Sequence, residues 1–112
     1  MLFRDLFRTD MVRVPPHWSA EVSNILWKAH RRGRIDRVEL GQIGTLATAI
    51  AGTVTISYPA AIDRLTEFAA ATQLTAYDAA YLMLAIDLKA PLLALDGKLS
   101  RAAVQHQVEV VR

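Results

Sequence analysis

The sequence of 112 residues contains no cysteine, which excludes disulfide bonds and thiolate metal sites. Long apolar runs are also missing. The longest, residues 79–86, falls well short of the roughly 20 residues needed to cross a bilayer. The N-terminus carries charges every few residues, which is atypical of a secretory signal. We therefore expect a cytoplasmic protein with no membrane partner.

Motifs that bind nucleotide phosphates are absent as well, because neither GxGxxG nor GxxxxGK[ST] occurs. The three histidines, His17, His30 and His106, show neither H-x-x-H nor HExxH spacing, so a zinc site or a Ser-His-Asp triad has no support. Carboxylates without imidazole or thiolate partners point instead to magnesium or manganese. A net charge of +2 permits contact with nucleic acid without demonstrating it.

Hydrophobic residues make up 53% of the chain, enough for one core, and the length predicts a single domain over residues 1–112. Helical and strand patterns alternate, which predicts an α/β fold with a short parallel sheet. The expected strands cover residues 11–14, 53–57, 91–95 and 108–111, the third of them buried on both faces. The expected helices cover residues 1–9, 19–32, 38–51, 60–74, 75–90 and 97–106.

Several helix ends carry local signals. Ser19 is predicted to cap the helix that Gly33 then ends with a left-handed residue. Asp36 is predicted to cap the next helix, so the two form a helical hairpin. The helix over residues 60–74 is amphipathic, and its predicted inward residues are Ile62, Leu65, Phe68 and Ala69.

Asp78 lies at the start of the apolar stretch TAYDAAYLMLAI, three residues after Thr75. This spacing is typical of a capping box, with Asp in place of Glu. The same carboxylate is also a candidate metal ligand. Asp87 and Lys89, near the other end of that helix, are interpreted as solvated surface.

Asp96 follows the apolar strand PLLAL. It fits a turn or helix cap, and equally a carboxylate at the carboxyl end of a parallel strand, where α/β sheets bind ligands. Glu21 lies in the first turn of its helix, where the dipole favours negative charge. Asn24 is one turn further on and faces the same way.

Three stretches together resemble the PIN-domain family, specifically toxins of the VapC type. The family patterns are E-x-x-N-x-L, Y-D-A-x-Y-L-x-L-A and P-L-x-T-x-D-x-x-L. Here they are matched by Glu21-Asn24-Leu26, by residues 77–85 and by Pro91-Leu92-Asp96-Leu99, with Ala94 in place of the threonine. Their order and spacing are similar to the family's, over most of the chain.

The resemblance implies a three-layer α/β/α sandwich and a ribonuclease that depends on Mg²⁺ or Mn²⁺. It also implies that Glu21, Asp78 and Asp96 share one acidic pocket, holding the metal and acting catalytically, with Asn24 as a hydrogen-bonding neighbour. Lys98 would lie near the pocket edge, where it either contacts a phosphate or, as we prefer, is a simple surface lysine. Clustered carboxylates repel one another until a cation joins them, so such a pocket is incomplete without metal.

The chain also departs from the family pattern. Family members begin with a strand that ends in an aspartate, as in V-D-A-S, and neither Asp5 nor Asp10 follows an apolar strand. We therefore expect an N-terminally truncated domain whose pocket lacks one ligand and whose sheet lacks one strand. Buried backbone groups left unpaired cost about 1–3 kcal/mol each, so rearrangement or a homodimer is expected to cover the gap.

Two functions remain open. The first is a metal-dependent ribonuclease of the toxin–antitoxin type, inhibited by a small antitoxin that packs on the helical hairpin. The second is a catalytically impaired PIN domain that serves as a dimerisation or antitoxin-binding module. An in-frame V-D-A-S-like stretch encoded upstream of Met1 would favour the first. Basic residues cluster near the hairpin turn, where they contact RNA or a partner, or simply remain solvated: Lys28, Arg31, Arg32, Arg34 and Arg37.

Overall fold

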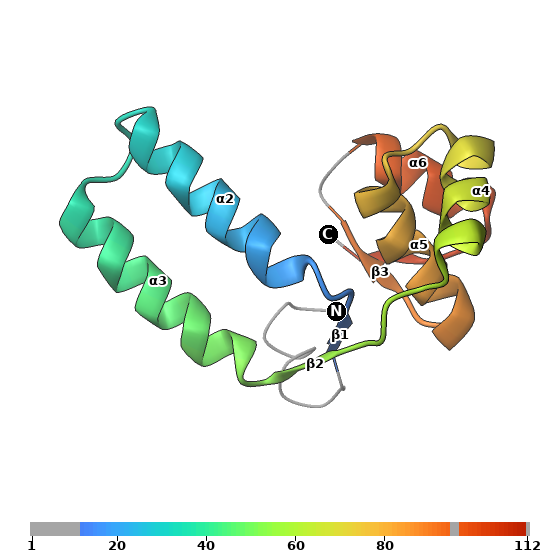
Figure 1. Ribbon diagram of the computed structural model, residues 1–112, viewed down its shortest axis with the longest axis horizontal. Coiled ribbons are helices and arrows are strands. Elements are labelled where there is room, and N and C mark those ends of the chain that lie inside the picture. Colours follow the sequence, from blue (N-terminus) through green and yellow to red (C-terminus); the bar gives the residue numbers. More distant parts are fainter. Residues whose placement is uncertain (1–11, 95–96, 112) are drawn as a thin grey trace. The chain divides into compact units, whose positions relative to one another are not determined.

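The computed structural model describes residues 12–94 and 97–111. Within them lie five helices and four short strands: β1 (Val12–Val14), α2 (Trp18–Arg31), α3 (Arg37–Ala51), β2 (Val54–Ile56), α4 (Ile62–Thr72), α5 (Ala76–Leu88), β3 (Leu92–Leu93), α6 (Gly97–Gln105) and β4 (Val110–Val111). The predicted mixed α/β class is confirmed (Figure 1). The helix predicted over residues 1–9 lies outside the described residues.

The chain divides into two compact units, Leu2–Ser57 and Tyr58–Arg112, called here the N-terminal and C-terminal units. Each has its own two-stranded parallel ladder, β1 with β2 and β3 with β4. Each of the four predicted strands is therefore present, and the parallel pairing is confirmed within each unit. The prediction of one domain over residues 1–112 stays a prediction.

In the N-terminal unit, β1 and β2 pair in register, Val12 with Val54 and Val14 with Ile56. The Ser57 N–H extends the ladder by donating to the Val14 carbonyl at 2.9 Å. Parallel strands need a long crossover between them, and here the crossover is the α2–α3 hairpin. The β1 strand consequently feeds directly into α2.

The start of α2 differs from the prediction. Ser19 was expected to cap it, but the N-cap position is His17, whose side chain makes no capping bond. The cause is the Pro15-Pro16 turn. Proline fixes φ near its helical value, and the Trp18 N–H donates to the Pro15 carbonyl at 3.1 Å. The helix therefore begins before the serine is reached.

The turn between α2 and α3 matches the prediction. Gly33 has φ +76°, and its N–H donates to His30 O while the Arg34 N–H donates to Ala29 O, both at 2.9 Å. These paired bonds form a Schellman motif. Asp36 then caps α3 in a full capping box: Glu39 N–H donates to Asp36 Oδ1 at 2.8 Å, and Asp36 N–H donates to Glu39 Oε1 at 3.1 Å.

The two hairpin helices lie side by side (Figure 1). On α3 the half-buried residues recur every three or four positions, which defines a narrow seam against α2: Leu40, Gly44, Ala47 and Ala51. Neither helix contains a fully buried residue. Large apolar side chains therefore remain exposed on the hairpin, among them Ile25 at 66% and Leu46 at 62%.

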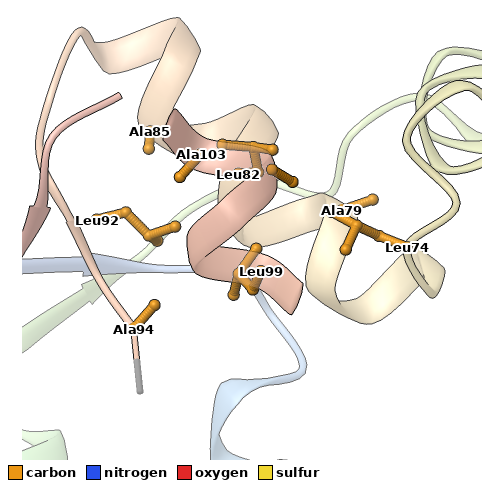
Figure 2. Packing of buried hydrophobic residues seen from close by; sticks show 9 residues of the cluster. Leu74, Ala79, Leu82, Ala85, Leu92, Ala94, Leu99 and Ala103 are labelled. Carbon is orange, nitrogen blue, oxygen red and sulfur yellow. The ribbon is translucent and has the colours of Figure 1, made fainter. Parts of the chain in front are cut away.

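The C-terminal unit, by contrast, encloses a core. Helix α5 contacts α4, α6 and β3, and its composition is apolar on all sides, as expected of a helix covered by several neighbours. Figure 2 shows side chains from α5, β3 and α6 converging on Leu82, which is fully buried. The buried cluster consists of Leu74, Ala79, Leu82, Ala85, Leu92, Ala94, Leu99, Ala102 and Ala103.

Two burial predictions in this unit are partly wrong. Leu65, Phe68 and Ala69 pack against the core as expected, but Ile62 is 85% exposed because the apolar face of α4 extends one turn beyond the core. Leu93 is 42% exposed, so β3 buries one face only. Its alternation follows the two-residue period of a strand with one covered side.

Among the helices of residues 12–94 and 97–111, none combines the length and apolar composition of a membrane-spanning segment.

Candidate functional site

Glu21 lies in the first turn of α2, close after the carboxyl end of β1. Its side chain is 38% exposed, and Oε1 lies 2.7 Å from His17 Nε2. The contact is short but poorly aligned for a hydrogen bond. The His17 ring therefore lies against the carboxylate beside the start of the helix, and part of the carboxylate remains exposed to solvent.

Asn24 is exposed and lies one turn after Glu21. Residues three apart on a helix are neighbours on its surface, so the amide accompanies the carboxylate as predicted. The structure thus places these two candidates on one stretch of α2.

Asp78 lies in the first turn of α5 and is half-buried. Thr75 is the N-cap, and its Oγ1 accepts the Asp78 backbone N–H at 3.2 Å. The threonine half of the predicted cap is confirmed. That bond uses the backbone of Asp78, so it does not require the carboxylate.

Asp96 lies outside the described residues. The chain on either side is Ala94, which is buried after β3, and Gly97, where α6 begins. Helix α5 and β3 are in contact and are joined by a short turn through Lys89, which adopts a left-handed conformation with φ +52°. The amino end of α5, which carries Asp78, and the carboxyl end of β3 consequently point the same way.

In the described part of the chain, three or more His, Asp or Glu side chains do not gather into a metal-binding group. Glu21 belongs to the N-terminal unit and Asp78 to the C-terminal unit, so their meeting stays a prediction. Their chemistry suits a hard cation: each is a half-buried carboxylate in the first turn of a helix, and Mg²⁺ and Mn²⁺ prefer oxygen ligands.

Asp87 has a structural role at the opposite end of α5. Arg64 donates to both of its carboxylate oxygens, at 2.6 and 2.9 Å. These hydrogen bonds lower the pKa of Asp87 and raise that of Arg64. Both side chains are about half exposed, so Asp87 is at the surface as predicted, but it is paired with an arginine.

Two local features escaped the sequence prediction. His17 contacts Glu21 at a spacing of four residues, a spacing that brings side chains together on a helix and was available in the sequence. The Arg31 guanidinium lies 5.2 Å from the centroid of the Trp27 ring, again at a spacing of four. Both contacts follow from helical periodicity once the helix is known to begin at Trp18.

A crystal structure of PAE2754 from Pyrobaculum aerophilum is similar to this chain, with a TM-score of 0.73 and 22% sequence identity. The similarity covers 80% of this chain and 65% of that chain, so this chain spans less than two thirds of that protein. At this identity the likeness shows a shared fold and carries no chemistry. Neither a protein-family model nor a curated protein matches the sequence.

Proposed function

We propose that the chain is a metal-dependent ribonuclease of the PIN/VapC toxin type, which hydrolyses RNA phosphodiester bonds with Mg²⁺ or Mn²⁺. The observation that carries this proposal is the ordered set of three stretches around Glu21, Asp78 and Asp96. The proposal includes the three-layer α/β/α sandwich, a cytoplasmic location, a homodimer and a small antitoxin as partner.

The placement of two of the acids supports the proposal. Glu21 and Asp78 each lie in the first turn of a helix, where the macrodipole favours the ionised carboxylate. Both are half-buried, which limits competition from water. Glu21 also follows the carboxyl end of a parallel strand, the edge at which α/β sheets bind ligands.

Glu21, Asp78 and Asp96 would hold the cation, and Asn24 would hydrogen-bond beside Glu21. A bound divalent ion lowers the pKa of a coordinated water and offsets charge on a phosphodiester. The chain's own contribution is orientation. His17 Nε2 lies 2.7 Å from the Glu21 carboxylate, and the Thr75 cap fixes the first turn of α5 and hence the position of Asp78.

Two variants can distinguish the helix cap at Asp78 from the proposed metal-ligand role of its carboxylate. Asp78→Asn keeps the backbone N–H that Thr75 accepts, and therefore keeps this cap while it removes the negative charge. Thr75→Ala removes the cap, at a cost of about 1 kcal/mol, and leaves the carboxylate. Cleavage of labelled single-stranded RNA is measured for both variants and wild type with Mn²⁺ and with EDTA.

We expect Asp78→Asn to reduce cleavage to the level seen with EDTA, and Thr75→Ala to lower the melting temperature but remain active. Equal activity of Asp78→Asn and wild type would refute the metal-ligand role. A folded wild-type protein without metal-dependent cleavage would refute the ribonuclease proposal.

The second candidate function is a non-catalytic module for dimerisation or antitoxin binding. One observation favours it: the α2–α3 hairpin has no buried residue and leaves large apolar side chains exposed, namely Ile25, Ile43, Leu46 and Ile50. Such surface is typical of interaction sites. Under this alternative, Leu46→Asp abolishes dimerisation in light scattering, and neither wild type nor any variant cleaves RNA.

A further inference from the structure

The hairpin turn carries an unusual concentration of positive charge. Its five cations are all exposed: Lys28, Arg31, Arg32, Arg34 and Arg37. In residues 12–94 and 97–111, the ion pairs His17–Glu21 and Arg64–Asp87 involve none of these five. The nearby carboxylates of Asp36 and Glu39 are engaged by backbone amides in the capping box.

Helix electrostatics explain only part of this cluster. Cations in the last turn of α2 suit the negative end of its dipole. Arg37, however, is the first residue of α3, where the dipole disfavours a cation. Lys28 and Arg32 are also four residues apart, a spacing at which like charges repel. The helix dipoles therefore account for the cations at the end of α2 but not for Arg37, which leaves an anionic partner as a further explanation of the cluster.

The surface of the hairpin turn is also concave. Lys28, Arg31 and Arg32 line a shallow hollow of about 180 Å³. Beside it the Trp27 ring is 50% exposed, and the Arg31 guanidinium lies 5.2 Å from its centroid. A hollow lined by cations can accept a phosphate, and the exposed aromatic ring beside it can stack on a base.

A polar stripe connects this surface to the candidate catalytic residue. Glu21, Asn24, Lys28 and Arg31 follow each other at spacings of three, four and three residues, which places them on one face of α2. The stripe runs about 15 Å along the helix axis at 1.5 Å per residue.

We propose that Trp27, Lys28, Arg31, Arg32, Arg34 and Arg37, the basic tip, bind the backbone of single-stranded RNA. The cations contact phosphates, Trp27 stacks on a base, and the bound strand follows α2 toward Glu21. The choice of RNA rests on the proposed function, whereas the charge and the ring are independent of it.

The test measures RNA binding without cleavage, by fluorescence anisotropy of a labelled single-stranded RNA in EDTA over a salt series. Arg31→Gln/Arg32→Gln is compared with the control Arg13→Gln/Arg101→Gln. Both double variants remove two exposed arginines, and both lower the net charge from +2 to 0. Circular dichroism establishes that each is folded.

We expect the tip variant to bind roughly tenfold more weakly, and the slope of log K against log salt to fall by about 1.4, or about 0.7 for each lost phosphate contact. The control keeps the affinity and the slope of wild type. Equal binding by the two double variants would overturn the proposal.

The base contact has its own readout. With Trp18→Phe as background, Trp27 is the single tryptophan, and we expect RNA to quench its emission. Trp27→Ala weakens binding roughly fivefold or more, and Trp27→Phe restores most of it, because an aromatic ring is retained. Unchanged emission at saturating RNA would exclude stacking.

Two outcomes separate this inference from the proposed function. Loss of binding in the tip variant, with no metal-dependent cleavage by wild type, supports the tip and refutes the ribonuclease. Cleavage that requires Asp78, together with equal RNA binding by the two double variants, refutes the tip alone. Binding to phosphatidylserine vesicles, with none to RNA, would also overturn the inference in favour of an anionic lipid surface.

Discussion

The two units of the chain bury their apolar residues to different extents. The C-terminal unit gathers nine buried residues into one cluster around α5. The helices of the N-terminal unit pack along a narrow seam and bury no side chain completely. Both units contain a parallel ladder and well-formed helix caps, so local structure is equally well specified in the two.

This difference assigns stability and recognition to different parts of the molecule. Packing in the C-terminal unit holds the turn that presents Asp78. The N-terminal hairpin is held chiefly by its seam and its turn, and it presents exposed apolar and basic side chains. An element with few buried contacts is suited to meeting partners, and the proposed antitoxin and RNA contacts both involve this hairpin.

The largest expected effect contrasts one leucine from each unit. Leu82→Ala removes a side chain with 0% exposure and should lower the free energy of unfolding by about 2–5 kcal/mol. Leu46→Ala removes one that is 62% exposed and should change it by about 0.5 kcal/mol or less. Urea denaturation measures both. Equal losses would contradict the contrast in burial.

A smaller effect is expected at the hairpin turn. A Cβ on Gly33 would meet no atom within 4 Å, but its φ is +76°, so Gly33→Ala should cost about 1–2 kcal/mol from backbone strain alone. Gly41 on α3 is equally open and has no positive φ. Gly41→Ala should therefore stabilise by up to about 1 kcal/mol. The same sign for both variants would argue against the left-handed turn.

Features decided within a few residues were predictable from the sequence. Gly33, Asp36 and Thr75 act where expected because each side chain or backbone preference satisfies groups less than one helical turn away. The Ser19 prediction was wrong for an equally local reason, since the Pro15-Pro16 turn starts α2 earlier.

Features that depend on packing between residues far apart in the sequence were harder to predict. The Arg64–Asp87 pair joins two helices across 23 residues of sequence. Helical periodicity does not predict a contact between separate helices. The exposure of Ile62 and Leu93 depends on where the core ends, which an amphipathic pattern does not specify. For the candidate site, the sequence predicts the helical positions of Glu21 and Asp78, which local signals specify. That the two carboxylates meet stays a prediction, because they belong to different units.

The smallest expected effect concerns that ion pair. Because Arg64 lowers the pKa of Asp87 in the folded state, the pair stabilises the protein above the ordinary aspartate pKa, about pH 4. This contribution is lost as the pH falls through the lowered value. Asp87→Asn should lower the melting temperature slightly at neutral pH, and the difference should shrink as the pH falls below about 4. Glu67→Gln, on the exposed face of α4, is the control. A difference that persists at acid pH would show that Asp87 acts through packing.

The central proposal is that Glu21 and Asp78 hold the same metal ion. The most direct measurement is a double-mutant cycle on Mn²⁺ affinity, with Glu21→Gln, Asp78→Asn and the double variant titrated calorimetrically without RNA, and Asp87→Asn as control. We predict that each single change weakens binding at least about tenfold, that the double change is less than additive by about 0.5–3 kcal/mol, and that the control binds as wild type does. Strictly additive losses, or wild-type affinity in either single variant, would contradict a shared site.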